Sequence, residues 1–365
     1  MSSGTDLEVR PFHLIQSLVM SRRGVIRAGM NLWIIFMLVG CGPITFTIGG
    51  SPATKPLSMS IVQTEGGWLG PRVAIIDVSG MLSNGPKRGL LSTSENPTSL
   101  LHEKLERART DPRVKAVLLR LNTPGGTVTA SDAMYRQLIR FKERSGKPVV
   151  AIMMDVAASG GYYLACAADR IVAYPSTVTG SIGVIIQTIS FKPAMDRLGI
   201  DAEAIVSGPN KDAGSPFSKL TEEHRQVLRS MLDDFYIRFV TLVRRSRSGI
   251  PAGRFDEVTD GRVYSGDAAL KVGLVDEVGD LHDAFALAKG LAGVKRAELV
   301  MYHRPNNTAR TPYAAASGVA GSPGANGLPG PGGVQINLAQ INLAENPVGR
   351  GVGFYYLWQP TRLDP

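Results

Sequence analysis

A serine followed by two glycines, Ser159-Gly160-Gly161, stands between an apolar run at 149–156 and a segment with a helical pattern. Glycine weakens both strands and helices, so this pair indicates either a tight turn or the close approach of another backbone. A serine at such a junction most often only caps the helix. Because a helix N-terminus also offers unpaired N–H groups and partial positive charge, the same serine can instead serve as a nucleophile at an anion-binding turn.

A second glycine turn, "TPGG" at 123–126, ends another apolar run, at 114–122. If the two apolar runs are parallel strands, both turns lie at the same edge of the sheet, where sites form in such folds. The backbone N–H groups of Gly125 and Gly160 could then converge on one oxygen. That arrangement is an oxyanion hole, which stabilises the tetrahedral intermediates of acyl transfer.

A serine nucleophile needs a base. Histidine is the usual choice, but the five histidines are scattered, and His224, the nearest one downstream, starts a polar helical turn. A lysine can serve if burial lowers its pKa from about 10.4 towards neutrality. Lys211 in "SGPNKDAGSP" (207–216) is the candidate, and a solvated surface lysine is the alternative interpretation of the same residue.

Five segments occur in the order seen in one family: "LNTPGGTVTAS", "VAASGGYYLACAADRIVA", "TGSIGVI", "SGPNKDAGSPF" and "GRVYSGDAALKVGLVDEVG". Over residues 72–300 the chain resembles signal peptide peptidase A, the membrane-bound Ser–Lys peptidases of bacteria. The resemblance implies that Ser159 is the nucleophile and Lys211 the general base. It implies that Ser181 of "TGSIGVI" orients the lysine through a hydrogen bond. The oxyanion hole would be formed by Gly125, Gly126 and the N–H of Gly160.

The same resemblance implies a fold and an assembly. The fold would be α/β, the Clp protease–crotonase spiral of ββα units. The chain carries one half only, so it resembles the short form of the family. Such single-half enzymes form membrane-seated rings in which each protomer contributes to the active-site groove. The implied function is a serine endopeptidase that degrades signal-peptide remnants or other unfolded apolar peptides, with no cofactor.

The elements that must position these residues alternate. Apolar runs predict strands at 72–80, 114–122, 148–156 and 170–175, and helical patterns lie between them at 99–112, 131–147 and 160–168. This order predicts a parallel sheet covered by helices. Further helices are expected at 221–247, with Thr221 as cap, and at 281–291, and a short helix capped by Ser265 is followed by a strand within 264–279.

The composition divides the chain into five parts. They are a signal or anchor at 1–50, a linker at 51–71, a peptidase domain at 72–303, a flexible Gly/Pro-rich segment at 304–350 and an aromatic tail at 351–365. The segment at 304–350 lacks the apolar content to fold alone. We expect "GVGFYYLWQP" (351–360), in contrast, to dock on another surface, because so aromatic a segment does not stay free in water.

The N-terminus has the layout of an export signal. Three arginines precede an apolar run from Met30 to Val39, and "LVGC" (38–41) resembles a lipoprotein cleavage box with Cys41 as the lipidated residue. An uncleaved membrane anchor is the alternative. Either interpretation places the catalytic domain on the extracytoplasmic side of a bacterial inner membrane. The formal net charge of +9 comes without basic runs alternating with aromatics, so nucleic-acid binding is not expected, and two lone cysteines predict neither a disulfide framework nor a metal site.

Two rival functions share these features. A crotonase-type acyl-CoA enzyme would use the paired N–H groups for an enolate, but that chemistry requires a carboxylate at the site and a cytoplasmic cofactor. The export signal and the Ser-Gly-Gly turn both argue against it. A catalytically inactive scaffold would have lost the serine or the lysine, and both are present. For a peptidase, the glycine-lined turns predict extended apolar substrates with small side chains next to the cut, and Ile152 and Val184–Ile186 are candidate pocket residues.

Overall fold

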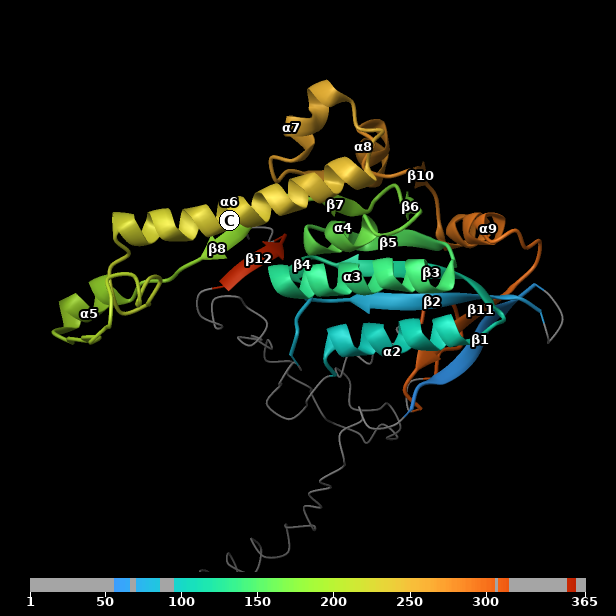
Figure 1. Cartoon of the computed structure of the whole chain (residues 1–365), viewed down its shortest axis with the longest axis horizontal. Coiled ribbons are helices and arrows are strands. Elements are labelled where there is room, and N and C mark those ends of the chain that lie inside the picture. The colour runs from blue at the N-terminus through green and yellow to red at the C-terminus, as the bar shows by residue number, and fades with distance from the viewer. Residues whose placement is uncertain (1–55, 66–69, 86–94, 306–307, 315–352, 359–365) are drawn as a thin grey trace, which may run out of the picture. The chain divides into compact units, whose positions relative to one another are not determined.

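The structure is a computed structural model that describes residues 56–65, 70–85, 95–305, 308–314 and 353–358 (Figure 1). The chain divides into the units 1–50 and 51–365. The predicted anchor with Cys41, and the greater part of the Gly/Pro-rich segment, lie outside the described residues. Within the described ranges, no helix combines the length and the apolar character that a membrane crossing requires.

The centre of the second unit is a mostly parallel sheet of nine strands. Its path runs β1-β11-β2-β3-β5-β6-β10, and β7 and β9 extend it beside β5. Among the described strands of this sheet, the pairs β1–β11 and β7–β9 are antiparallel and the other pairs are parallel. The strands are β1 (Ser58–Thr64), β2 (Arg72–Ser79), β3 (Val114–Thr123), β5 (Val149–Ala158), β6 (Arg170–Ala173), β7 (Val178–Gly180), β9 (Val263–Ser265), β10 (Glu277–Val278) and β11 (Glu298–His303).

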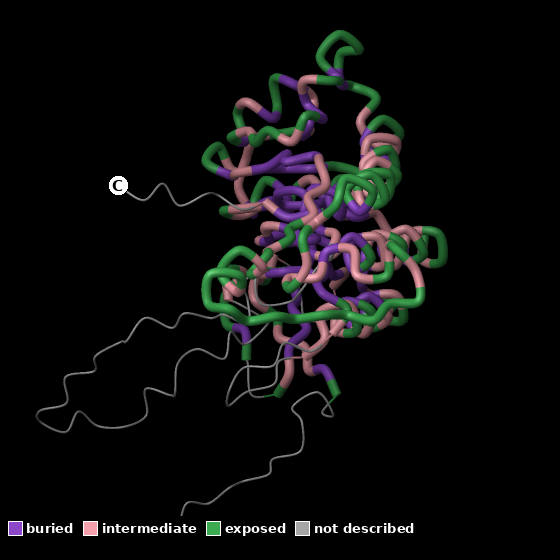
Figure 2. Tube along the Cα trace, turned by 90° about the vertical axis from the view of Figure 1, so that its left-hand side faces the viewer, coloured by how far each residue is buried: buried purple, intermediate pink, exposed green. Residues whose placement is uncertain are grey.

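Helices cover both faces of this sheet, as the β-α-β-α-β pattern predicts. Residues alternate along β2: Ala74, Ile76 and Val78 join the core under α2, α3 and α4, while Val73 and Ile75 face α9. In Figure 2 the buried segments of the described residues gather in the interior and the exposed segments lie around them. The helices are α2 (Pro97–Thr110), α3 (Val128–Ser145), α4 (Gly160–Ala165), α5 (Lys192–Leu198), α6 (Glu222–Ser246), η2 (Ala252–Arg254), α7 (Phe255–Val258), α8 (Gly266–Lys271) and α9 (Leu281–Leu291).

A second, small sheet stands beside the ends of β3 and β5. It has the order β4-β12-β8, with β4 (Gly125–Thr127), β8 (Ile185–Gln187) and β12 (Gly353–Leu357). The strand β12 is the aromatic tail that was expected to dock, and it pairs antiparallel with both neighbours. The expectation is confirmed, and the surface on which the tail docks belongs to the same chain.

Residues 188–237 form an exposed arm of α5, the following loop and the first half of α6. Of the 14 exposed large hydrophobic residues in the described ranges, nine lie in this arm, and Ile205 is 99% exposed. They are Phe191, Leu198, Ile200, Ile205, Val206, Phe217, Val227, Met231 and Ile237. The second half of α6 is different, because Phe239, Leu242 and Val243 are buried in the core. An apolar exposed patch of this kind is typical of an interaction surface.

Two assignments made from composition differ from the structure. Residues 58–64 lie in the predicted linker, yet they form the edge strand β1, because backbone pairing with β11 does not require apolar side chains. Residues 308–314 lie in the segment predicted to be flexible, yet Arg120 holds them by donating hydrogen bonds to the carbonyl oxygens of Pro312 and Ala314. Arg120 is itself paired with Asp77 at 2.7 Å inside the protein.

Candidate active site

Ser159 occupies the sharp corner between β5 and α4. Its φ of 54° and ψ of −113° lie in a region that side-chain-bearing residues rarely adopt. The corner is held from both sides, because the Ser159 N–H donates to the Gly180 carbonyl at 2.8 Å and its own carbonyl accepts from the Tyr163 N–H at 2.9 Å. The hydroxyl makes no capping hydrogen bond to α4. The helix-cap interpretation of this serine is therefore wrong, and the hydroxyl is left for another role.

Ser181 lies at the neighbouring strand end. Ala158 of β5 pairs with Gly180 of β7, so the two serines directly follow residues that lie side by side. Ser181 also has a positive φ, 50°, and these two serines are the only described residues other than glycine with that property. Strained backbone of this kind costs about 1–3 kcal/mol per residue and persists where the surrounding structure enforces it, often at functional sites.

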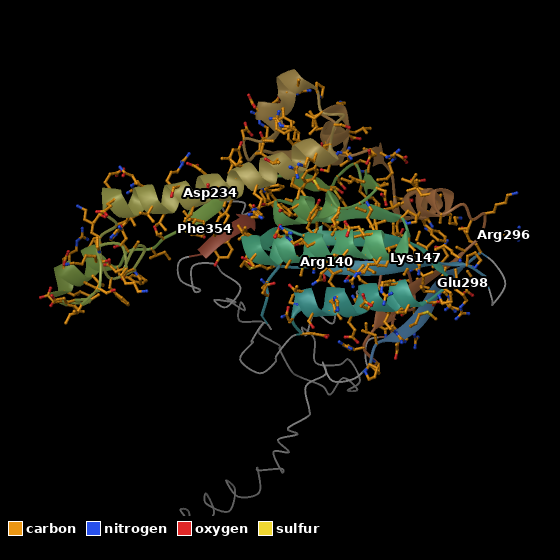
Figure 3. The ribbon with its side chains drawn as sticks, in the orientation of Figure 1. Arg140, Lys147, Asp234, Arg296, Glu298 and Phe354 are labelled. Atoms are coloured by element: carbon orange, nitrogen blue, oxygen red, sulfur yellow. The ribbon has the colours of Figure 1, made fainter. Side chains whose placement is uncertain are left out.

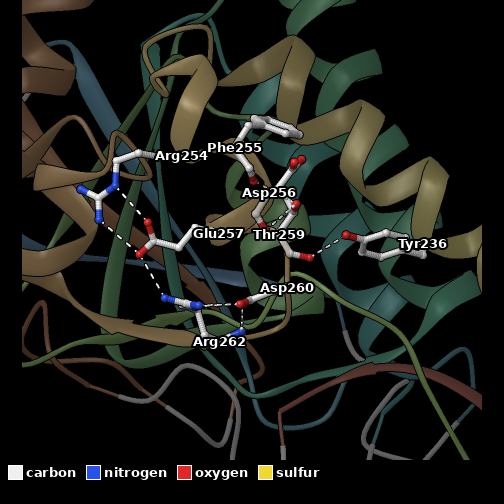
Figure 4. Close-up of polar contacts among 8 residues, drawn as sticks. All are labelled: Tyr236, Arg254, Phe255, Asp256, Glu257, Thr259, Asp260 and Arg262. Carbon is white, nitrogen blue, oxygen red and sulfur yellow. Dashed lines mark hydrogen bonds and ion pairs between the residues drawn. The ribbon is translucent and has the colours of Figure 1, made fainter.

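The turn around Arg262 holds the strained backbone of Ser181 in place. The Ser181 N–H donates to the Arg262 carbonyl at 2.8 Å. Figure 4 shows how the Arg262 side chain is held: its guanidinium pairs with Asp260 at 2.7 Å and with Glu257 at 3.0 Å. The same turn is linked to α6, because the Tyr236 hydroxyl donates to the Thr259 carbonyl at 2.8 Å. Sequence reasoning did not identify this cluster.

The three predicted oxyanion glycines lie together, but their roles differ. The Gly125 N–H is already used, since it donates to the Thr123 hydroxyl at 3.1 Å. Gly125, with a φ of 102°, instead allows the Gly160 backbone to lie close to it, because a Cβ at position 125 would lie only 2.7 Å from the Gly160 nitrogen. Gly126 is bracketed by Leu82, which donates to the Gly125 carbonyl and accepts from the Thr127 N–H. The N–H of Gly126 therefore points away from Leu82, towards β12.

Lys211 is exposed and lies on the arm, in the loop between α5 and α6. The loop is fixed to the start of α6, where His224 Nε2 meets the Pro209 carbonyl at 2.7 Å. The helix α6 contacts α4, the helix that follows Ser159, at a point far from the start of α6. There the rings of Phe239 and Tyr163 have their centroids 5.0 Å apart. Fifteen residues of helix between His224 and Phe239 span ~22 Å. Within one chain, Lys211 is therefore not brought to Ser159.

Tyr162 and Tyr163 anchor α4 behind the serine. The Tyr162 hydroxyl donates to the Leu274 carbonyl at 2.8 Å, and the Tyr163 hydroxyl donates to Asp132 at 2.9 Å. Burial raises the pKa of both phenols well above the usual value, so they stay neutral and act as donors. Ile152, a predicted pocket residue, is instead plain core on the α9 face of the sheet. Ile185 and Ile186 of the other predicted pocket lie on β8 and pair with β12.

Comparisons with known proteins find relatives that are named as peptidases. The family description "Peptidase family S49" matches residues 141–295. A protein of Enterococcus faecium named as a signal peptide peptidase SppA is 31% identical over 65% of this chain and 69% of its own length. "Protease 4" of Salmonella typhi is 35% identical over 64% of this chain and 37% of its own length. A protein of Synechocystis named as a protease is 34% identical over 61% of this chain and 75% of its own length.

The matches cover only part of the length of several relatives. The match spans 62% of a Methanocaldococcus jannaschii protein named as a protease, with 39% identity, and little more than a third of the Salmonella typhi relative. A solved structure of a membrane-bound stomatin-specific protease superposes with a TM-score of 0.36 at 19% identity, covering 59% of this chain and 83% of that one. The two relatives covered over more than two thirds of their length carry names of peptidases. The chain belongs to the signal peptide peptidase A family, peptidase family S49.

Proposed function

We propose that this protein is a membrane-associated endopeptidase that uses Ser159 as nucleophile and Lys211 as general base to degrade signal-peptide remnants or other unfolded apolar peptides. The observation that carries the proposal is the corner at Ser159, where a strained serine with an uncapped hydroxyl directly precedes Gly160, and the Gly160 backbone lies against Gly125 of the neighbouring glycine turn. Ser181 follows the paired strand end, from which it can orient the base.

The chemistry follows from this arrangement. The Ser159 oxygen attacks the carbonyl carbon of a peptide bond while its proton passes to the base. The developing oxyanion accepts hydrogen bonds from Gly126 and from Gly160, whose N–H in the first turn of α4 has no partner within the helix. The base then gives the proton to the leaving amine. Water hydrolyses the acyl-enzyme by the same steps and restores Ser159.

A second copy of the chain supplies the base in this proposal. Lys211 lies on the exposed arm, about 20 Å along α6 from the helix contact near Ser159, and a lysine side chain cannot bridge that distance. The arm presents nine exposed large hydrophobic residues, which a neighbouring copy would cover. In a ring, one interface repeats head to tail, so each arm reaches the Ser159 corner of the next copy. This supports the family's ring-shaped assembly for this chain.

The proposal also includes the finer statements on fold and location. The family membership supports the Clp protease–crotonase spiral of ββα units for the sheet and its helices. The arginine-flanked apolar run at 22–39 and Cys41 support attachment to the extracytoplasmic side of a bacterial inner membrane, as a lipoprotein or through an uncleaved anchor. Intact-mass measurement of the membrane-extracted protein separates the two forms of attachment, because a lipoprotein begins at Cys41.

The test of the proposal combines a serine-reactive fluorophosphonate probe with hydrolysis of an apolar reporter peptide. Wild-type protein reacts at Ser159 and cleaves the peptide, and both Ser159→Ala and Lys211→Ala lose cleavage while they remain folded. Lys219→Ala is the matched control, because Lys219 is another exposed lysine in the same loop. Cleavage that persists at the wild-type rate in Lys211→Ala would exclude this lysine as the base.

A further inference from the structure

Thr123 is a fully buried polar residue at the carboxyl end of β3, directly before the glycine turn. It is 0% exposed. In Figure 3 this end of the sheet is the one towards Phe354, and Glu298, at the start of the parallel strand β11, marks the opposite end. A buried hydroxyl costs free energy unless hydrogen bonds satisfy it, so the partners of Thr123 show which backbone segments it holds.

The Thr123 hydroxyl connects the end of β2 to the glycine turn. It donates to the Gly80 carbonyl, with the two oxygens 2.6 Å apart, and it accepts from the Gly125 N–H at 3.1 Å. A hydroxyl has one proton and two lone pairs, so it makes both bonds at once. Within the described part of the chain, Thr123 is the one residue whose side chain hydrogen-bonds the backbone of 124–126. The conformation of the turn therefore depends on this hydroxyl.

The bond from Thr123 to Gly125 helps to fix the direction of the next N–H group in the chain. The Gly125 carbonyl accepts from the Leu82 N–H at 2.8 Å. That carbonyl and the Gly126 N–H belong to one planar trans peptide group, in which they point in opposite directions. The Gly126 N–H therefore points away from Leu82, and it keeps this direction only while Gly125 is held. Two adjacent glycines have so much backbone freedom that they need such a constraint from outside the turn.

The Thr123 methyl group contacts the segment that contains the other oxyanion donor. A Cβ at Gly161 would lie 2.8 Å from the Thr123 Cγ2 atom and 3.0 Å from the Thr123 carbonyl oxygen. The first turn of α4, which contains the Gly160 N–H, is thus packed directly against Thr123. Because the hydroxyl and the methyl group branch from one Cβ, a single rotamer of Thr123 places the first at Gly125 and the second at Gly161. One side chain therefore positions both donor segments.

We propose that Thr123 is a positioning residue of the oxyanion hole: its hydroxyl fixes the direction of the Gly126 N–H, and its methyl group fixes the distance to the Gly160 N–H. The inference rests on the proposed function of Ser159. Thr123 acts through the two donors, because N–H groups that are already oriented stabilise the oxyanion without rearranging in the transition state. Loss of the hydroxyl should therefore lower kcat and leave KM nearly unchanged, since the donors act mainly on the transition state.

The experiment compares variants of the full chain in hydrolysis of an apolar reporter peptide. Thr123→Val keeps the shape of the side chain and removes the hydroxyl, so kcat should fall by about 10²-fold while KM changes little. Thr123→Ser keeps the hydroxyl and loses only the methyl group, so its kcat should lie between that of Thr123→Val and that of wild type. Thr177→Val is the matched control, because Thr177 is also 0% exposed and its hydroxyl donates to the Met154 carbonyl at 2.6 Å rather than to the glycine turn. This control should lose stability and keep its kcat.

A peptide aldehyde probes the oxyanion hole without turnover. The Ser159 oxygen bonds to the aldehyde carbon, the serine proton passes to the base, and the aldehyde oxygen becomes the oxyanion. The affinity of Thr123→Val for the aldehyde should fall by the same factor as its kcat/KM, because the adduct resembles the transition state. A purely structural role would lower the thermal stability of Thr123→Val and Thr177→Val alike and leave the aldehyde affinity unchanged, which would overturn the inference.

Fluorophosphonate labelling of Ser159 separates the two proposals. Wild type that is neither labelled nor active on the reporter refutes the proposed function, and the role of Thr123 with it. If wild type is labelled and active, a Thr123→Val enzyme that keeps the wild-type kcat, or that changes only in KM, overturns the role of Thr123 and leaves the proposed function standing. Should Thr123→Val not fold, Thr123→Ala takes its place with the same prediction, because the smaller side chain adds no contact to the core.

Discussion

Replacing Gly125 by alanine should strongly reduce kcat/KM and should lower the stability of the fold only modestly. The residue has a φ of 102°, and an added Cβ would lie 2.0 Å from the Tyr356 oxygen and 2.7 Å from the Gly160 nitrogen. The conformation alone costs an alanine about 1–2 kcal/mol. The methyl group would also displace the substrate carbonyl from the oxyanion donors, and the loss of one such donor reduces kcat by about 10²–10³-fold. We therefore expect kcat/KM to fall at least ~100-fold.

Gly146→Ala is the matched control. Gly146 also has a positive φ, 64°, where it ends α3, but a Cβ there meets nothing within 4 Å. Its alanine variant should lose a similar ~1 kcal/mol of stability and keep its activity. The assay is hydrolysis of an apolar quenched fluorescent peptide, with thermal unfolding of each variant measured in parallel. A Gly125→Ala enzyme whose kcat/KM lies within about threefold of Gly146→Ala would refute the oxyanion assignment.

Three further predictions concern buried groups. Burial lowers the pKa of Lys104, so the unfolded chain binds the proton that the folded chain releases. The stability of wild type relative to Lys104→Met should therefore rise with pH up to about 10. Thermal unfolding in which the stability difference between the two proteins does not change with pH would contradict this. Arg120→Ala leaves Asp77 without its buried partner, which should cost about 3–5 kcal/mol and expose 308–314 to limited proteolysis; an unchanged cleavage pattern would exclude the anchoring role. Burial raises the pKa of Cys166 to about 12, so iodoacetamide at pH 8 should modify this thiol only after unfolding, and rapid labelling of the folded protein would show that the site opens.

The sheet and its helices were predictable from local patterns. Asp111-Pro112 ends α2 within two residues of the expected position, and Thr221 caps α6 by accepting from the His224 N–H at 3.1 Å. The strand β1 was missed because its Ser- and Gln-containing sequence resembles a linker, and it is a strand only through its pairing with β11. Local sequence does not encode such a partner, which lies some 240 residues away.

The site was predictable in part. The glycine-containing turns alone predicted that Ser159, Gly125 and Gly160 lie at one sheet edge, because neighbouring parallel strands end at the same edge. Ser181 came only from the family resemblance, since its position depends on the pairing of β5 with β7. The docking of the tail followed from its aromatic residues, but its location depends on registers with two distant strands. The distance from Lys211 to Ser159 could not be foreseen either, because it is set by the straight run of α6.

Mixing two inactive variants tests most directly whether Ser159 and Lys211 form one active site across two copies. Ser159→Ala supplies the lysine and Lys211→Ala supplies the serine, so neither alone should cleave the reporter peptide. After the variants are dissociated together and reassembled, a serine copy meets a lysine copy at about a quarter of the head-to-tail interfaces, and about a quarter of wild-type activity should return. Mixed assemblies that form but remain inactive would contradict the shared site, and so would full activity in either variant by itself.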